Sequence, residues 1–437
     1  MILLNPVVIS VLVLCILCLL KLDVLLTLLV AAVVGGLAAG MSMSDTMGYL
    51  ISGMGGSSET ALSYILLGIF AAAMEHTGVA AIFAKKIGSM VKGNKTVLVW
   101  VLAGVACLSQ NLIPVHIAFI PILIPPMLML MNKLHLDRRA VACALQFGLK
   151  APYITIPAGF GMIYHTIVAN NITKNGLAVS NMEIWKVTWL IGTAMLIGLC
   201  VAVFWAYSKP REYNMDEDAV RKYEMEQNRE TKLNRDHIVT LVGAVSTLGI
   251  QLYFGSLPLG ALFGLAIMIL FGAIKWKDIE KLVMTGMHIM AYIAFIMLVA
   301  EGFGNVLSKS GAIDQLVQFA VNVSGGSKLI ASTAMVLTGL VIVTGLGTSF
   351  GTVPVLSVLY VPICMGMGYS VPATILLIAA SAAIGDAGSP VSDTALGPTA
   401  GLSVDGQHDH IWDTCVPGFI YFNIPIALTA IIGSVMI

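Results

Sequence analysis

Long apolar runs dominate this chain, and polar residues gather in a few short stretches between them. A helix that crosses a lipid bilayer needs about 20 consecutive apolar residues. Runs of that kind lie near residues 6–20, 22–41, 58–80, 185–207, 237–254, 257–273, 287–303 and 414–436. The pattern predicts an all-α protein that crosses a membrane several times.

Two further apolar segments in each half of the chain are interrupted by polar and small residues. The first interruption lies at 109–111 in one half and at 349–352 in the other, about 240 residues later. A second interruption follows each of them, at 148–152 and at 386–390. Paired interruptions at matching places in two halves of an apolar chain indicate the binding site of a secondary transporter.

The distribution of lysine and arginine predicts the topology, because these residues are enriched in cytoplasmic loops. Basic loops at 85–95, 133–139, 209–236 and 275–281 are therefore expected in the cytoplasm. The segment between the first two of these loops must begin and end on the same side of the membrane. It is predicted to be a re-entrant hairpin, at about 97–128.

The same reasoning predicts two inverted repeats, 1–208 and 237–437, joined by a polar cytoplasmic linker at 209–236. Each repeat is expected to contain three spanning helices, a re-entrant hairpin, a broken helix and a closing span. The first broken helix is predicted to be interrupted at Lys150–Pro152 and again around Pro157–Gly161. The two broken helices and the second hairpin are expected at about 139–170, 371–402 and 328–367.

Composition supports the membrane assignment and excludes several classes of function. Hydrophobic residues make up 58% of the chain and charged residues 11%, against roughly 45–50% and about 25% in soluble proteins. The net charge is zero, which gives no basis for binding nucleic acid. The seven cysteines lie in or beside apolar stretches and predict no disulfide framework. No nucleotide-binding loop, catalytic triad or metal-ligand spacing is present, so we expect no enzyme, cofactor or bound metal.

Side chains with oxygen atoms gather at the interruptions. Hydroxyl and amide oxygens are hard ligands suited to sodium, and the ends of half-helices leave backbone groups that favour small ions. A single Ser or Thr is more often a helix cap or a packing contact, but as two clusters we interpret these residues as a site. The candidates for binding substrate or ion are Ser109, Gln110, Asn111, Thr155, Thr348, Ser349, Thr352, Ser389, Ser392, Asp393 and Thr394.

Ionisable residues within membrane spans are functional candidates. Asp386 and Asp393 flank the second break of the second half, where each could bind a cation or take up a proton. Lys150 lies at the matching break of the first half. It either pairs with an aspartate and holds the halves together, or it occupies the place of a cation, which would favour proton coupling. Glu301 and His116 are candidates for a proton-linked role.

The stretch Gly385–Thr394, Gly-Asp-Ala-Gly-Ser-Pro-Val-Ser-Asp-Thr, resembles the glycine–aspartate–serine–proline–serine–aspartate–threonine motif of NhaC-type sodium/proton antiporters. The hairpin tips resemble those of the wider ion transporter superfamily, which includes dicarboxylate and citrate carriers. The whole pattern is most similar to a bacterial branch labelled sodium/proton antiporter family, some members of which are regarded as histidine-type amino-acid permeases.

The resemblance implies a scaffold domain that forms a homodimer and a transport domain that moves in an elevator fashion. It also implies that substrate and cation bind between the hairpin tips and the helix breaks. Carried over by position, Ser109 and Asn111 match the first tip. Ser349 and Thr352 match the second tip less well, because Gly351 replaces its asparagine.

The leading hypothesis is a secondary active transporter in the inner membrane of a bacterium. It would move a small polar solute, with an amino acid favoured, by alternating access coupled to Na⁺ or H⁺. Lys150 and Gln110 depart from the sodium-carrier pattern, which argues against sodium at the first half-site. The alternative is a sodium/proton antiporter without organic substrate, in which Asp386 and Asp393 exchange the ions. A channel or structural subunit is disfavoured, because broken helices in inverted halves suit alternating access.

Overall fold

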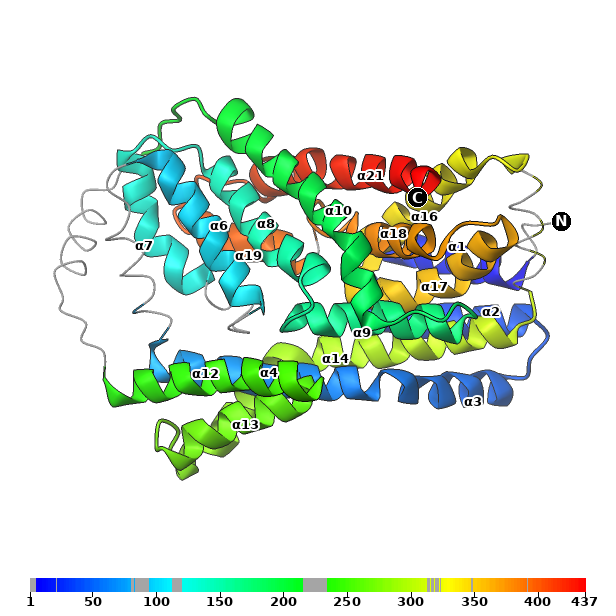
Figure 1. Ribbon diagram of the computed structural model, residues 1–437, viewed down its shortest axis with the longest axis horizontal. Coiled ribbons are helices and arrows are strands. Elements are labelled where there is room, and N and C mark those ends of the chain that lie inside the picture. Colours follow the sequence, from blue (N-terminus) through cyan, green and yellow to red (C-terminus); the bar gives the residue numbers. More distant parts are fainter. Residues whose placement is uncertain are drawn as a thin grey trace.

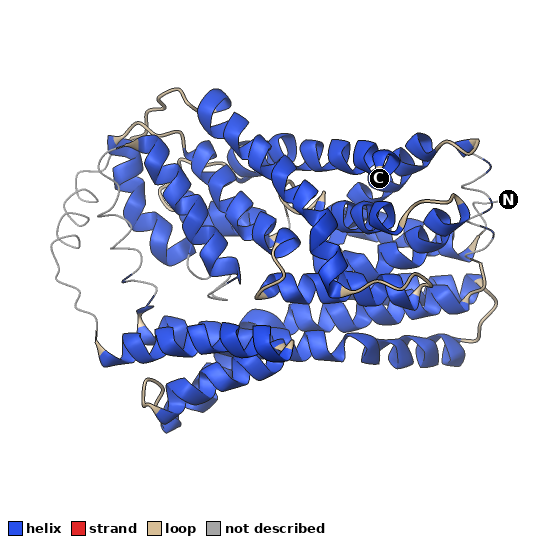
Figure 2. Cartoon of the chain, in the orientation of Figure 1, coloured by secondary structure: helices blue, strands red, loops and turns tan. Residues whose placement is uncertain are grey.

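The computed structural model contains helices joined by short loops. It describes residues 5–20, 22–79, 82, 94–111, 120–214, 234–312, 315, 318, 322, 324–346, 349–390 and 392–437. Every regular element in this part of the chain is helical, as Figure 2 shows. The all-α class predicted from the apolar runs is confirmed.

The first half of the chain forms nine α-helices within the described residues. They are α1 (Pro6–Leu19), α2 (Val24–Ala38), α3 (Met43–Met54), α4 (Ser58–Thr77), α6 (Lys95–Asn111), α7 (Ile120–Lys133), α8 (Arg138–Thr155), α9 (Phe160–Lys174) and α10 (Asn181–Val201). A short 3-10 segment, η2 (Gly55–Ser57), joins α3 to α4. A π-helical turn, η4 (Ala202–Ala206), extends α10.

The second half contains a similar series of helices. They are α12 (Arg235–Phe254), α13 (Leu257–Leu270), α14 (Ile279–Lys309), α16 (Lys328–Leu346), α17 (Ser349–Gly366), α18 (Val371–Ala383) and α19 (Asp393–Leu402). A 3-10 turn, η5 (Trp276–Asp278), precedes α14. The closing helix consists of η6 (His410–Cys415), α20 (Val416–Gly418), η7 (Phe419–Asn423) and α21 (Ile424–Met436), and two of these segments are π-helical.

Five described helices are long and apolar enough to cross a bilayer. They are Asn181–Ala206, Arg235–Phe254, Met290–Lys309, Ser349–Gly366 and His410–Met436. Their burial differs widely: 83% of the most apolar window in Ser349–Gly366 is buried, against 28% in His410–Met436. The former is therefore an interior helix, while the latter presents most of its apolar surface to the surroundings.

The helices form two groups that lie against each other (Figure 1). The frame group comprises α1–α4 and α12–α14, and the core group comprises α6–α10, α16–α19 and the closing helix. Within the frame group, α14 packs along α2, α3 and α4, and α12 packs on α13. Within the core group, α8 packs against α6, α10 and α19. The groups meet mainly where α14 packs on α17, with smaller contacts between α1 and α16 and between α4 and α9.

The contact between α4 and α14 depends on two glycines. A Cβ atom on Gly68 would lie 2.4 Å from the carbonyl oxygen of Gly286, and a Cβ atom on Gly286 would lie 2.3 Å from the amide nitrogen of Ile69. Small residues of this kind allow membrane helices to bring their backbones close together.

The first broken helix departs from its prediction. The interruption expected at Lys150–Pro152 does not occur, because α8 continues through Pro152 as far as Thr155. The break lies at residues 156–159. Ile156 is extended (φ −108°, ψ 118°), as expected of a residue that precedes a proline, here Pro157. Gly159 has φ +58°, a conformation that favours glycine. Pro157 thus ends α8, because it disfavours the helical conformation of Ile156 before it.

The other interruptions begin at helix ends. In the second broken helix, α18 ends at Ala383, and α19 begins after Ser392, whose side chain caps it by accepting from the amide of Thr394. In the segments predicted to be hairpins, Ser109–Asn111 form the last turn of α6 and Ser349 begins α17. The tips themselves, at 112–119 and 347–348, lie outside the described residues.

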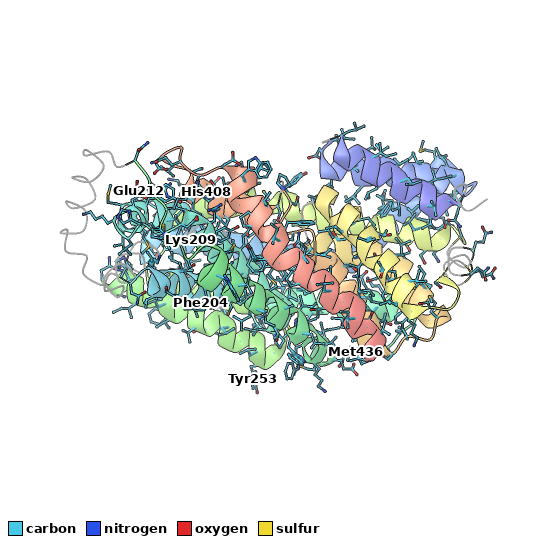
Figure 3. The ribbon with its side chains drawn as sticks, turned by 90° about the horizontal axis from the view of Figure 1, so that it is seen from above. Phe204, Lys209, Glu212, Tyr253, His408 and Met436 are labelled. Atoms are coloured by element: carbon cyan, nitrogen blue, oxygen red, sulfur yellow. The ribbon has the colours of Figure 1, made fainter. Side chains whose placement is uncertain are left out.

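A buried arginine ties the start of α8 to the turn that follows α19. Arg138 is fully buried, and its guanidinium donates to both carboxylate oxygens of Asp405 at 2.6 and 2.5 Å. It also donates to the carbonyl of Leu402 and to Asn132. Figure 3 shows Lys209, Glu212 and His408 at the same end of the molecule.

Burial alone would raise the pKa of Asp405, but the hydrogen bonds and charge of Arg138 outweigh it, and the pKa is lowered. A carboxyl with a lowered pKa in the folded state stabilises the fold above its unfolded pKa of about 4. That contribution is lost as the pH falls through the lower, folded-state value.

We expect Asp405→Asn to lower the free energy of unfolding at neutral pH by about 3 kcal/mol, near the lower end for breaking a buried ion pair, because Asp405 is partly exposed. Thermal unfolding of the purified protein would measure the change. The difference from the wild type should shrink as the pH falls below about 4. Glu280→Gln, which changes an exposed carboxylate at the start of α14, is the control and should have little effect.

Gly286→Val should separate α4 from α14, with a cost of about 3 kcal/mol or more for overpacking. The expected results are a lower melting temperature and aggregation on size-exclusion chromatography. Gly249→Val is the matched control, since a Cβ atom there meets nothing within 4 Å. Equal melting temperatures for the two variants would contradict this account of the α4–α14 contact.

Candidate functional site

The Asp386 carboxylate is the centre of the largest side-chain network at the second helix break. Asp386 lies in the turn between α18 and α19 and is 5% exposed. Its Oδ2 atom accepts hydrogen bonds from the hydroxyls of Tyr153 and Ser349, each at 2.9 Å. Its Oδ1 atom accepts from the hydroxyls of Ser392 and Thr394, the latter at 3.1 Å. We call these five residues the Asp386 cluster.

Three separate elements supply this cluster. Tyr153 comes from the last turn of α8 and Ser349 from the first residue of α17, while the others belong to the turn and to the start of α19. Ser392 has two roles, because its oxygen caps α19 while its hydroxyl donates to the carboxylate. The carboxylate therefore lies beside a helix N-terminus, where the helix dipole favours negative charge.

Lys150 lies close to the cluster but does not pair with it directly. The side chain is fully buried, and its ammonium group donates to the carbonyl of Ala383. Ala383 is the last residue of α18, and the carbonyls in the last turn of a helix lack partners within the helix. The charge of Asp386 also acts on Lys150. The direct contact of Lys150 is therefore with the C-terminus of α18, while both roles considered for this lysine from the sequence stay predictions.

One face of α8 carries the residues that reach the break. Gln146, Lys150 and Tyr153 are spaced by four and three residues, so they share a face of the helix. Gln146 donates to the carbonyls of Ala387 and Thr414, at 2.8 and 3.3 Å. The sequence analysis missed Gln146 and Tyr153, although their spacing from Lys150 is visible in the sequence.

Two buried amides beside the break have polar atoms without hydrogen-bond partners in the described structure. These atoms are Oε1 of Gln146 and both amide atoms of Asn423. A Cβ atom on Gly388 would lie 2.7 Å from Nδ2 of Asn423, and one on Gly418 would lie 2.7 Å from Oε1 of Gln146. The amides therefore lie against the glycines where the break contacts the closing helix.

Aromatic rings enclose the cluster on the side of the frame group. The ring centroid of Phe350 lies 5.0 Å from that of Tyr153, 5.5 Å from that of Tyr164 and 5.7 Å from that of Tyr64. Tyr64 belongs to α4, so this contact crosses between the groups. A wall of rings limits access of water, which strengthens electrostatic interactions inside the site.

The remaining candidates from the sequence are placed as follows. Thr352 and Ser389 are buried on the same elements as the cluster, in α17 and in the break. Thr155 donates to the carbonyl of Ala151 in its own helix, at 2.7 Å, and does not join the cluster. Glu301 forms an ion pair with Lys174 between α14 and α9. The side chains of Ser109, Gln110, Asn111 and Asp393, and all of His116 and Thr348, lie outside the described part.

Comparison with protein families and relatives gives a consistent result. The Na⁺/H⁺ antiporter family model matches residues 144–433, a range that contains the whole Asp386 cluster, and a second Na⁺-H⁺ antiporter family matches residues 5–91. An uncharacterized membrane protein of Vibrio parahaemolyticus is 43% identical over 99% of this chain and 100% of its own length. “Putative amino acid transporter YuiF” of Bacillus subtilis is 40% identical over 91% of this chain and 92% of its own.

Two solved transporter structures have a similar fold. MtrF of Neisseria gonorrhoeae, described as illuminating a class of antimetabolite efflux pumps, has a TM-score of 0.61 at 13% identity, covering 90% of this chain and 84% of its own. The YdaH transporter of Alcanivorax borkumensis has a TM-score of 0.59 at 14% identity, covering 89% and 88%. The family match and the relatives place the chain in the Na⁺/H⁺ antiporter family, as a multi-pass membrane transporter and not an enzyme.

Proposed function

We propose that this protein is a cation-coupled secondary active transporter that moves an amino acid across the cytoplasmic membrane by alternating access. The family supports coupling to Na⁺ or H⁺. The Bacillus subtilis relative, at 40% identity, is named as a putative amino acid transporter, which supports an amino acid as the solute. The observation that carries the proposal is the buried Asp386 carboxylate, which four hydroxyl groups hold at a break between two half-helices.

Asp386 is the coupling residue in this proposal. A buried carboxylate is costly unless a cation or a proton compensates its charge, and its direct side-chain partners in the described structure are neutral hydroxyls. The oxygens of Tyr153, Ser349 and Thr394 lie within 3.1 Å of the carboxylate. Hydroxyl and carboxylate oxygens together suit Na⁺, while the carboxylate alone suffices for H⁺. Binding of either ion would neutralise the charge of the Asp386 carboxylate at the break.

Lys150 fills a second cation position permanently in this proposal. Its ammonium occupies the carbonyl end of α18, where transporters with broken helices hold a coupling ion. One ion site is then built into the chain, and Asp386 supplies the exchangeable one. The unused oxygen atoms of Gln146 and Asn423 are further candidate ligands on the far side of the same break.

Alternating access is supported by the order of the helices. The hairpin α6–α7 corresponds to α16–α17, the broken helix α8–α9 to α18–α19, and α10 to the closing helix. Figure 1 shows α6 and α7 near one end of the molecule and α16 and α17 toward the other, as inverted copies require. The proposed repeats are 1–208 and 237–437, with the linker at 209–236. The core group would move against the frame group, and the frame group would form the homodimer.

A sodium/proton antiporter without organic substrate is the second candidate, and the description of the matched family favours it. Proteoliposomes separate the two. We expect saturable uptake of labelled amino acids that depends on an imposed Na⁺ or H⁺ gradient. Ion exchange at full rate without solute, together with no uptake of any amino acid, would instead support the second candidate.

Asp386→Asn should abolish coupled transport, because the amide keeps the size of the side chain but cannot take up a cation or proton in the same way.

Tyr153→Phe should weaken the apparent cation affinity about tenfold, since a hydrogen bond to a charged group contributes about 1.5–3 kcal/mol. Uptake kinetics at varied ion concentration would measure both effects. Thr155→Val, which changes a hydroxyl bound only to its own helix, is the control, and an equal effect there would remove the cluster from the mechanism.

Lys150→Ser should convert the built-in cation position into one that needs an external ion. Transport is expected to fall at least tenfold at low Na⁺ and to recover in part at high Na⁺. Uptake at a series of Na⁺ concentrations would show this, with Lys186→Ser, an exposed lysine on α10, as the control. Unchanged transport at every Na⁺ concentration would contradict the role given to Lys150.

A further inference from the structure

A polar cavity lies between the frame group and the core group, apart from the Asp386 cluster. Its volume is about 470 Å³, within the range of roughly 300–1,000 Å³ typical of small-molecule sites. Segments of α3, α9, α14 and α17 line it, and none of the residues of the Asp386 cluster is part of the lining. The cavity therefore is a separate place where a solute fits.

An ion pair between the groups forms the charged part of the cavity. Nζ of Lys174, in the last turn of α9, lies 2.5 Å from Oε1 of Glu301 in α14. The two side chains differ in exposure, at 46% for Lys174 and 9% for Glu301. The lysine can turn into solvent on its flexible stem, whereas the carboxylate stays in the wall of the cavity.

The chain keeps open space beside this pair. Gly56 lies in η2, where the run from α3 to α4 tightens into a 3-10 turn. A Cβ atom at Gly56 would lie 2.5 Å from Nζ of Lys174 and 2.8 Å from Oε1 of Glu301. A larger residue would have to displace the charged ends of these side chains, so glycine leaves the most space beside the pair.

The other polar side chains in the lining are three amides, the hydroxyls of Ser52 and Ser308, and a second lysine, Lys309. Asn171, Asn175 and Asn305 use their NH₂ groups as donors to the backbone carbonyls of Ile167, Asn171 and Tyr49, respectively. Their orientation is thus fixed by the backbone. The cavity combines one fixed carboxylate with lysine ammonium groups and several amides, so it offers partners for both charges of a small zwitterion.

We infer that this cavity binds the α-ammonium and α-carboxylate of an amino acid, with the ammonium on Glu301 and the carboxylate on Lys174. The inference rests on the proposed function, which it deepens by placing a second solute site outside the Asp386 cluster. The bound zwitterion takes the place of the direct ion pair. Because the pair joins α9 to α14, its replacement also removes one link between the core group and the frame group.

Charge balance selects a zwitterion over simpler ligands. Removing one partner of an ion pair leaves the other charge uncompensated, which is costly for a group as buried as Glu301. A zwitterion pairs with both members of the ion pair at once, whereas Na⁺ or a simple anion pairs with only one of them. An amino acid therefore replaces the ion pair at little electrostatic cost.

The test measures binding in a protein that cannot carry out coupled transport. Full-length Asp386→Asn protein in lipid nanodiscs is dialysed against a mixture of tritiated proteinogenic L-amino acids, and then against each amino acid alone. We expect binding to persist. Adding Glu301→Gln or Lys174→Met should weaken it at least tenfold, which corresponds to about 1.4 kcal/mol. Lys186→Met, at an exposed lysine outside the cavity, should leave it unchanged.

Two further measurements make the assignment specific. N-acetylated amino acids and amino alcohols, each lacking one of the two charges, should fail to displace the bound label. The exchanged pair Lys174→Glu with Glu301→Lys keeps both charges in the cavity and should recover part of the binding, which a merely misfolded variant would not.

Several results would overturn the inference. These are binding that survives Glu301→Gln, displacement by N-acetylated amino acids, and loss of all binding on Asp386→Asn alone. The last result would locate the solute at the Asp386 cluster and leave the proposed function intact. Failure of the proposed function is seen separately, as the absence of amino-acid uptake by the wild-type protein in proteoliposomes.

Discussion

The fold is organised around one buried carboxylate that has no cationic side chain in direct contact with it among the residues that the structure describes. Asp386 is held by hydroxyl groups from α8, α17 and α19, so one ionisable group connects the ends of three helices. Such a group is retained in a membrane protein only if its charge can be compensated. The hydroxyl shell, the helix N-terminus at Ser392 and the ammonium of Lys150 nearby all act on that charge. Both the site and the packing of these three helix ends therefore depend on compensation of the Asp386 charge.

Much of the architecture was visible in the sequence, because apolar runs of membrane-spanning length leave few alternatives. The helices near 185–207, 237–254 and 414–436 were predicted from hydropathy alone and lie in long apolar helices of the structure. The helix α3 was not predicted, because its 12 residues are too short and too mixed in polarity to stand out. The break predicted at Pro152 does not occur, and α8 continues through it. A proline inside a membrane helix can be tolerated when neighbouring helices and side chains satisfy the freed backbone group.

The candidate site was predictable as a region but not as a network. Clusters of Ser, Thr and Asp near residues 349 and 386–394 indicated the correct elements, because polar atoms are rare in apolar runs and are therefore conspicuous. Tyr153 and Gln146 escaped notice, since an aromatic residue or a single amide on a helix is common and only the fold shows what it contacts. The direct partner of Lys150 could not be predicted either, because a sequence does not show which backbone carbonyl a side chain will contact.

The contact of Phe350 with Tyr64 constrains how the two groups can move. Apolar contacts between rings have no strict direction, so in the proposed movement of the core group Phe350 would exchange its contact with Tyr64 for another apolar contact. The hydroxyl network around Asp386 tolerates no comparable shift, because hydrogen bonds weaken steeply once they are stretched or bent. In the proposed movement of the core group, a boundary of this kind would act as a slip plane, and the break, its carboxylate and the bound ion would be displaced together as one rigid unit.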